Sequence, residues 1–205
     1  MMEPNSQIVS YFVRHGSTAL NQNDSFRGPL NVPLDAEGIQ QGKDLNAFFK
    51  PIALGAAYSS DMDRTLHTAD LALAGKGMSV SPTADLRALN VGNFAGQPKA
   101  PNQFQMQYYQ DNPNETIPGG ESLHAFRKRV QPRIKTAILA GIQTGVPSVS
   151  FVHSSIIHEV SHIITGNHNA VKVKPGGVVG VGWDGKNLSA KALFREQKRG
   201  NGYGG

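Results

Sequence analysis

The sequence predicts an α/β fold, a three-layer α/β/α sandwich whose central sheet is mostly parallel. Short apolar runs of strand length alternate along the chain with longer segments that carry apolar residues at helical spacing. This alternation is typical of sheets with helices on both faces. Polar residues follow directly after several apolar runs, where ligands bind in such sheets. We expect residues 1–199 to form a single domain and residues 200–205 to form a flexible glycine-rich tail.

The first half of the chain contains three predicted strands and two predicted helices. Residues 8–13 form an apolar, β-branched and aromatic run that predicts a buried strand ending at Arg14. Asp35 is the expected N-cap of a helix over residues 36–50, which Pro51 ends. The other elements of this half are a strand at 54–58, a helix capped by Asp61 and reaching residue 74, and a strand at 78–81.

The second half begins with an irregular region, residues 85–120, with one helix expected near residues 103–109. A long helix is predicted over residues 121–140, and Pro132 is expected to kink it or end it early. The remaining elements are a strand at 148–152 that ends at His153, a helix at 154–165, and a closing hairpin of strands at 178–183 and 188–193.

The composition excludes several classes of protein. The chain has 205 residues, of which 39% are hydrophobic and 17% charged, unlike a disordered chain. Cysteine is absent, so disulfides, thiolate zinc sites and cysteine nucleophiles are excluded. No apolar run is long enough to span a bilayer, and the N-terminal residues lack a signal-peptide pattern. We therefore expect a soluble cytoplasmic protein with no membrane partner.

The net charge of +5 leaves anionic partners open. Most basic residues are scattered singly, and the one dense group, residues 191–199, runs into the glycine-rich tail. We interpret this group as a solvated chain end, so nucleic acid is not an expected partner. The sequence leaves the oligomeric state open, a homodimer included.

Two arginines and two histidines lie just beyond predicted strands. Arg14 and His15 follow the first strand, Arg64 follows the second, and His153 follows the strand at 148–152. Arginine forks match phosphoryl oxygens, and nearby cations lower the pKa of a histidine and keep it neutral. A neutral histidine can attack phosphorus, so the four residues predict a phosphate pocket with a nucleophile. Two backbone contributions are expected as well, a close approach at Gly16 and N–H donors at Ser154.

Several short motifs follow one another along the chain. They are RHGST at 14–18 with Asn21 after it, FRG at 26–28 with PL at 33–34, SSDMDRT at 59–65, PGGES at 118–122, and VH at 152–153. In this order they resemble the histidine phosphatase superfamily, in its phosphoglycerate-mutase-like branch (branch 1). The resemblance covers most of the chain and implies the phosphoglycerate-mutase-like fold.

The resemblance implies a phosphatase that needs no cofactor. His15 would attack the phosphorus of a small phosphorylated substrate, and water would then hydrolyse the phosphohistidine. Arg14, Arg64 and His153 would hold the phosphoryl oxygens. A mutase is less expected, because it must retain its phosphoryl group in a closed site and usually has a longer chain. Two further positions match the border of the family's pocket, Asn21 and Glu121, and both equally fit turn or helix-cap roles.

The chain departs from the family pattern at one catalytic position. Many relatives carry a Glu in a Leu-x-Glu segment that protonates the leaving oxygen, and Ala88 stands at that position here. General acid catalysis typically contributes about 10²–10⁴-fold, so alkyl phosphates are expected to react slowly. Three explanations stay open. The first is that another carboxylate, Asp85 or Glu121, donates the proton. The second is that the natural substrate has a good leaving group. The third is that the protein binds phosphorylated ligands with little turnover.

A second motif predicts different chemistry. His158-Glu159-x-x-His162 fits the HExxH pattern of zinc proteases, and His168 has the spacing of a third ligand. However, Thr165 replaces the glycine expected after the second histidine, and no methionine lies downstream for a Met-turn. The helix also carries apolar residues that fit packing on a sheet. We therefore interpret the histidines as polar positions of a half-buried helix without metal, and keep a zinc-dependent protease as the alternative function.

Overall fold

The computed structural model describes residues 6–196, in which strands and helices alternate along the chain. The strands are β1 (Gln7–Arg14), β2 (Ala56–Ser60), β3 (Val80–Thr83), β4 (Ser148–Val152), β5 (Val173–Trp183) and β6 (Leu188–Glu196). The α-helices are α1 (Ala19–Gln22), α2 (Ala36–Phe49), α3 (Asp63–Ala72), α4 (Lys99–Asp111), α5 (Leu123–Thr144) and α6 (Ser154–Thr165). Two short 3₁₀ turns, Ala84–Leu86 and Gly92–Phe94, lie between β3 and α4.

The described strands form a sheet in the order β3-β2-β4-β1-β5-β6. The pairs β1–β4, β4–β2 and β2–β3 are parallel, and β5 runs antiparallel to both β1 and β6. All residues of β4 are buried, as expected of a central strand covered on both faces. The expected mostly parallel sheet is confirmed.

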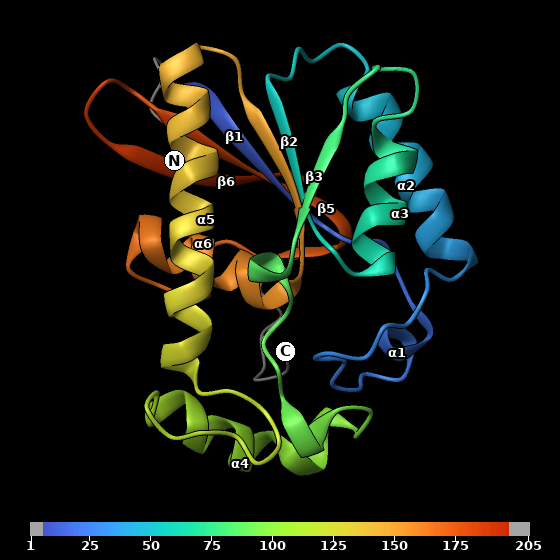
Figure 1. The fold of residues 1–205 in the computed structure, drawn as a ribbon, viewed down its shortest axis with the longest axis vertical. Coiled ribbons are helices and arrows are strands. Elements are labelled where there is room, and N and C mark those ends of the chain that lie inside the picture. The colour runs from blue at the N-terminus through green and yellow to red at the C-terminus, as the bar shows by residue number, and fades with distance from the viewer. Residues whose placement is uncertain (1–5, 197–205) are drawn as a thin grey trace.

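Helices cover both faces of the sheet (Figure 1). On one face, α5 and α6 pack with Phe12 of β1 in a core that includes Val130, Ile134 and Ile156. On the other face, α2 and α3 pack with Val13 of β1. Neighbouring residues of β1 thus enter opposite cores, because successive side chains of a strand point to opposite faces. The three-layer α/β/α sandwich is confirmed.

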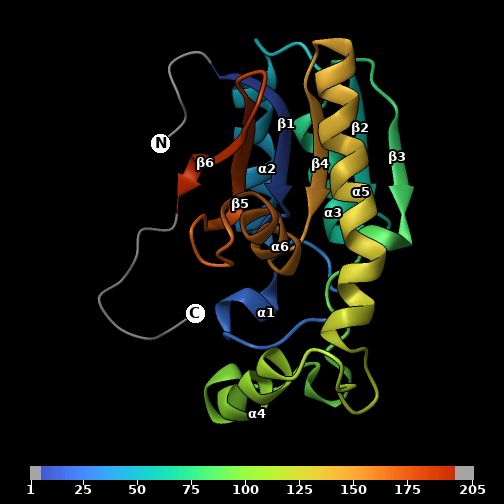
Figure 2. The ribbon, with the colours of Figure 1, turned by 90° about the vertical axis from the view of Figure 1, so that its left-hand side faces the viewer.

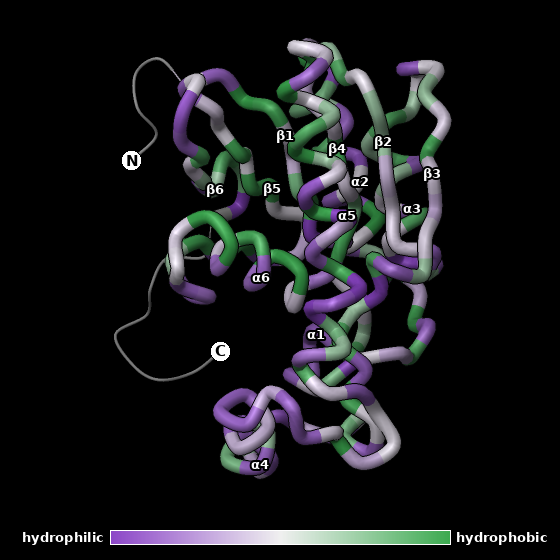
Figure 3. Tube along the Cα trace, turned by 60° about the vertical axis from the view of Figure 1, so that its left-hand side comes forward, coloured by the Kyte–Doolittle hydropathy of each residue, from purple (hydrophilic) through white to green (hydrophobic). Residues whose placement is uncertain are grey.

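The parallel strands point toward one end of the molecule, where α1 and α4 lie (Figure 2). Figure 3 shows that α4 is mainly hydrophilic, in contrast to the hydrophobic stretches of the strands and of α6. Met106 is the buried residue of α4, and Phe104 on the same helix is 82% exposed. Helix α4 is therefore a lightly anchored cover beyond the strand ends.

The expected N-cap of α3 is wrong. The helix begins at Asp63, whose backbone N–H donates to Oδ1 of Asn31 at 3.0 Å. Asp61 instead accepts two hydrogen bonds from Arg87, each 2.7 Å long. A side chain from a distant loop takes the capping role, which local spacing does not reveal.

The expected early end of the long helix at Pro132 is also wrong, because α5 runs unbroken to Thr144. Pro132 removes one backbone donor, and the carbonyl it would have bonded belongs to Lys128. Both residues are exposed, so water can satisfy that carbonyl while the opposite face of the helix packs on the sheet.

The remaining differences concern element ends. The strand expected at 78–81 lies two residues later, and the helix expected near 103–109 extends to Lys99–Asp111. No described helix, within residues 6–196, is both long and apolar enough to cross a membrane. The glycine-rich tail at 200–205 and the end of the basic group at 191–199 lie outside the described residues.

Candidate active site

Two histidines that follow neighbouring strands form the centre of the site. Arg14 at the end of β1 pairs with Val152 at the end of β4, so His15 and His153 occupy the next positions of adjacent parallel strands. The N–H of His15 donates to the carbonyl of Val152 at 3.0 Å. The two imidazole centroids are 5.3 Å apart, and the residues are 1% and 2% exposed. The expected convergence of these histidines is present in the structure.

The tautomer of His15 follows from its hydrogen bond. Its Nδ1 lies 2.7 Å from the carbonyl oxygen of Gly16. A carbonyl only accepts, so Nδ1 donates and carries the proton. In the neutral ring this leaves Nε2 with the lone pair. Burial, followed by the charges of His153 and Arg64, holds the pKa of His15 well below its ordinary value. His15 is therefore a neutral imidazole at neutral pH, with an unprotonated Nε2.

His153 has no hydrogen-bond partner at either ring nitrogen among the described residues. Burial, followed by the charge of Arg64, holds its pKa well below the ordinary value for histidine. A buried polar group without a partner is uncommon and costs free energy. A bound anion that accepts a hydrogen bond from this ring would remove that cost.

The two lowered histidine pKa values predict that acidification destabilises the fold. In the unfolded chain each histidine gains a proton below about pH 6.5, whereas the folded state keeps both neutral until a lower pH. The free energy of unfolding should therefore fall as pH decreases below 6.5, by up to about 1.4 kcal/mol per pH unit for each histidine. Urea unfolding between pH 7 and 5 measures this slope. In a His153→Gln variant the free energy of unfolding should depend less steeply on pH, because one of the two histidines is gone. A slope equal to that of the wild type would show that His153 does not contribute to it.

Arg14 and Arg64 place guanidinium groups beside the histidines. Arg14 Nη1 donates to the carbonyl of Val173 at 2.9 Å. Arg64, which is fully buried, donates to the carbonyls of Leu30 at 2.7 Å and Gly28 at 3.3 Å. Burial is the main cause that lowers the pKa of Arg14 to about 9 and of Arg64 to about 10, so both stay cationic at neutral pH. The Nε atoms of both are buried without a partner among the described residues.

A third arginine belongs to the same cluster and is not among the site residues that the sequence predicts. Arg27 lies in the loop after α1, and its charge lowers the pKa of Arg14, His15, Arg64 and His153. Its position depends on contacts between distant segments. In the sequence, Arg27 could be noticed only because it lies inside the FRG motif at 26–28. That motif contributes to the family resemblance but does not indicate a role for the arginine.

Three further residues predicted for the site have polar groups of which only some form hydrogen bonds. They are Gly16, Asn21 and Ser154. The N–H of Gly16 donates to Oγ1 of Thr68, and a Cβ at Gly16 would lie 2.5 Å from the carbonyl oxygen of Gly38. The close approach at Gly16 is thus between two chain segments. Asn21 Oδ1 accepts from Thr18, which leaves its amide NH₂ as the donor. Ser154 is the first residue of α6, where backbone N–H groups lack helical partners.

One arginine makes several of the contacts that hold the segment around Ala88. Arg129 donates to the carbonyls of Asp85, Arg87 and Ala88 at 3.0, 2.9 and 2.9 Å. It also donates to both carboxylate oxygens of Glu121, at 2.6 and 3.1 Å. Every guanidinium N–H of Arg129 is thereby used. Arg129 thus binds three carbonyls of the segment that carries Ala88, which the bonds from Leu89 N–H to Ser155 and from Asn90 N–H to Glu121 hold as well.

The two carboxylates considered as alternative acids are engaged elsewhere. Glu121 Oε1 accepts from the N–H of Asn90 at 2.8 Å in addition to Arg129. Asp85 pairs with Arg133 at 2.8 Å, and both side chains are largely exposed. Ala88 itself carries no polar side-chain atom. Both carboxylates are therefore paired with arginines, and the side chain at position 88 has no proton to donate.

Replacing Arg129 with methionine is expected to lower the free energy of unfolding by about 2–4 kcal/mol, because Glu121 and three carbonyls would lose charged hydrogen bonds. Urea denaturation measures the loss. Arg133→Met is the matched control, since its exposed pair with Asp85 should contribute no more than about 1 kcal/mol. Equal losses in the two variants would show that Arg129 does not anchor the segment.

The HExxH residues lie on α6 but do not surround a common point. His158 Nδ1 is 2.8 Å from the carbonyl of His168, and the rings of His162 and His168 are stacked with centroids 4.0 Å apart. Glu159 is buried and accepts from Gln131 at 2.8 Å and Arg127 at 3.4 Å. Within residues 6–196 no group of three or more His, Cys, Asp or Glu side chains could hold a metal ion. The motif is part of the packing between α5 and α6.

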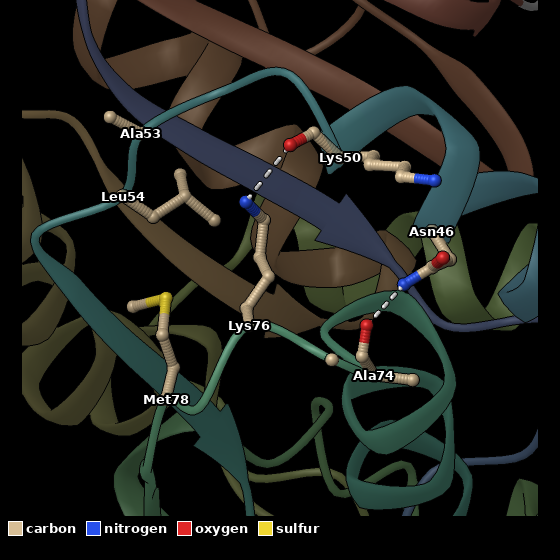
Figure 4. A pocket seen from close by; sticks show the side chains of 8 residues that line it. Asn46, Lys50, Ala53, Leu54, Ala74, Lys76 and Met78 are labelled. Carbon is tan, nitrogen blue, oxygen red and sulfur yellow. Dashed lines mark hydrogen bonds between the residues drawn. The ribbon is translucent and has the colours of Figure 1, made fainter.

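A cavity at the other end of the sheet holds none of the candidate residues. It lies among the ends of α2 and α3 and the start of β2, and is lined by Lys50, Leu54 and Met78 among others (Figure 4). Lys76 Nζ donates across it to the carbonyl of Ile52 at 2.8 Å, and Asn46 donates to Ala74 at 2.8 Å. Its polar groups therefore bind its own walls.

Comparison with known proteins shows which family the chain belongs to. A family model described as "Histidine phosphatase superfamily (branch 1)" matches residues 10–193. The "Probable phosphoglycerate mutase GpmB" of Escherichia coli O1:K1 is 28% identical over 131 residues, covering 62% of this chain and 61% of that relative. The chain thus aligns with about three fifths of that relative's length. A 2,3-bisphosphoglycerate-dependent phosphoglycerate mutase of Bradyrhizobium sp. (strain ORS 278) is 26% identical and covers 85% of this chain and 86% of its own.

Solved structures show the same fold. A phosphoglycerate mutase from Thermus thermophilus superposes with a TM-score of 0.69 and 27% identity, covering 92% of this chain and 98% of its own. An alpha-ribazole phosphatase from Shigella flexneri superposes with a TM-score of 0.75 at 21% identity, covering 93% and 98%. The expected phosphoglycerate-mutase-like fold is confirmed.

Proposed function

Because the chain belongs to the histidine phosphatase superfamily (branch 1), we propose that it hydrolyses a small phosphorylated substrate through a phosphohistidine on His15. The substrate is a phosphomonoester or a phosphoanhydride. The observation that supports this most is the pair of buried imidazoles, 5.3 Å apart, next to arginine Nε atoms that lack partners. Such a site suits a tetrahedral dianion, which supplies acceptor oxygens to each of these donors.

In the proposed reaction His15 Nε2 attacks the phosphorus while Nδ1 keeps its proton and donates it in a hydrogen bond to the carbonyl of Gly16. As the P–N bond forms, positive charge develops on the imidazole, and that carbonyl stabilises it. Arg14 and Arg64 neutralise the equatorial oxygens, and His153 donates one hydrogen bond to them. Water then attacks the phosphohistidine and releases inorganic phosphate. Asn21 and Ser154 border the pocket as donors.

The leaving group must depart without a carboxylic acid at position 88. Asp85 and Glu121 are already paired with Arg133 and Arg129, so we propose that neither donates the proton. An alkoxide is a poor leaving group without that proton, whereas phenolates and phosphates leave readily. The proposed enzyme therefore favours substrates with good leaving groups.

We propose a phosphatase rather than a mutase. A mutase must keep water from its phosphohistidine, and most residues of α4, the helix beyond the strand ends, are exposed, with Met106 buried and Tyr109 partly buried against a small apolar cluster. A lightly anchored cover allows water to reach the intermediate. A protein that binds phosphorylated ligands with little turnover is a second candidate, favoured by the alanine at position 88.

Rapid-quench labelling tests these proposals. Mixing the protein with a ³²P-labelled aryl phosphate should give a label that is lost in acid and retained in alkali, followed by steady release of inorganic phosphate. Transfer of the label to an added hydroxyl compound would favour a mutase. A stoichiometric label without further release would identify the binding protein, and absence of any label would exclude the phosphohistidine route.

A further inference from the structure

We propose that Arg27 selects substrates whose leaving group is itself anionic, above all phosphoanhydrides, a specificity that rests on the proposed phosphatase function. Within the described residues, the guanidinium of Arg27 forms neither a hydrogen bond nor an ion pair. The other arginines of the site donate to backbone carbonyls. Arg27 is thus the arginine of this cluster that has none of its guanidinium donors engaged within the described residues.

The chain on either side of Arg27 fixes where its side chain lies. Phe26 exchanges backbone hydrogen bonds with the opposite loop, donating to Gln97 at 2.9 Å and accepting from Gly96 at 2.8 Å. Its ring packs beside Phe94, with centroids 6.1 Å apart. Successive side chains of an extended segment point to opposite sides, so Arg27 points away from that apolar cluster.

The following residue, Gly28, links Arg27 to both halves of the site. Its carbonyl accepts from Arg64 Nη2 at 3.3 Å, on the side of the transferred phosphoryl group. Its φ of +47° and its contact with the next segment require glycine, since a Cβ would lie 2.6 Å from Val91 Cγ2 and 3.4 Å from the carbonyl of Leu89. Leu89 adjoins Ala88, the position that faces the leaving oxygen in relatives. Arg27 therefore lies between the phosphoryl site and the leaving-group side.

The carboxylate near Arg27 compensates its charge only in part, since burial outweighs the effect of Asp24 on the pKa of Arg27. Asp24, the nearby carboxylate, is paired with Lys99 at 2.5 Å. Burial lowers the pKa of Arg27, which shows that part of its hydration is lost on folding. A partly desolvated cation beside other cations is costly unless an anion binds it. One phosphoryl group has Arg14, Arg64 and His153 as ligands, so Arg27 is available for a second anionic group.

A phosphoanhydride substrate would account for both the cation at Arg27 and the missing acid at Ala88. Nε2 of His15 bonds to the terminal phosphorus as the bond to the bridging oxygen breaks, and the electron pair remains on that oxygen. The departing group is a phosphate, which carries the charge without needing a proton from an acid. Arg27 stabilises that charge as it develops. Water then hydrolyses the P–N bond and yields inorganic phosphate.

The test compares kcat/KM for inorganic pyrophosphate and for p-nitrophenyl phosphate, whose leaving group lacks a second phosphate. Arg27→Gln should lower the pyrophosphate value about 10- to 100-fold more than the aryl phosphate value. Arg27→Lys should restore part of that difference, and exposed Lys135→Gln should leave it unchanged. Equal losses on both substrates would mean that Arg27 holds the transferred phosphoryl group, and would overturn the proposal, as would no loss.

A binding measurement separates this proposal from the phosphatase function. Calorimetric titration of pyrophosphate into His15→Ala protein, with and without Arg27→Gln, reports recognition in the absence of turnover. Binding at least about 10-fold weaker in the double variant supports the role of Arg27, and equal binding overturns it. Failure of wild-type protein to form a phosphohistidine would instead count against the function proposed for His15.

Discussion

Replacing His15 with alanine is expected to lower phosphatase turnover by on the order of 10⁴-fold or more, since the covalent route is lost with the nucleophile. Arg14, Arg64 and His153 would still bind the substrate, so KM should change far less than kcat. The acid-labile ³²P label should disappear. Steady-state kinetics with an aryl phosphate, together with label trapping, measures both effects.

The control for this variant is His124→Ala. His124 lies on the first turn of α5, is exposed, and should tolerate the change without loss of rate. Circular dichroism and urea unfolding would show that His15→Ala keeps the fold. Retention of more than about a tenth of wild-type turnover would rule out His15 as the nucleophile.

Introducing glutamate at position 88 is expected to raise the turnover of alkyl phosphates by about 10²–10⁴-fold, the usual contribution of a general acid. Ala88 is partly exposed, and its carbonyl is held by Arg129 at 2.9 Å, so the backbone should carry the new side chain in place. Aryl phosphates should gain much less, because their leaving groups do not need the proton.

The matched control is Ala88→Gln, which has nearly the same shape but carries no transferable proton. A series of leaving groups from nitrophenol to simple alcohols should show a steep dependence on leaving-group pKa for wild type and the Gln variant, and a shallow one for Ala88→Glu. If the Glu and Gln variants gave the same dependence, the alanine would not be what limits alkyl phosphates.

Patterns within single segments predict most of the fold. The apolar runs before Arg14 and His153 are long enough to indicate buried strands, and parallel strands bring their ends together at one edge. The strand at 148–152 and the helix at 154–165 have the expected bounds. The sequence alone is therefore sufficient to place both histidines at strand ends on the same edge of the sheet.

What the sequence does not predict depends on contacts between distant segments. Asn31 replaces Asp61 in capping α3, and Arg27 reaches the site because Phe26 pairs with the loop at 96–97. The HExxH spacing is real, but His158 bonds to the carbonyl of His168, His162 stacks on its ring, and within the described residues no three such side chains are arranged to hold a metal ion. Local spacing carries no information on such pairings.

The two imidazoles belong to residues that directly follow interior strands, since β1 and β4 each have a hydrogen-bonded neighbour on both sides. Their separation is thus built into the lattice of the sheet, whose strands lie about 4.8 Å apart, and no hinge lies between them. The two rings therefore keep their separation as long as β1 and β4 remain paired. The loops around the histidines can therefore differ in sequence while the two rings keep their separation.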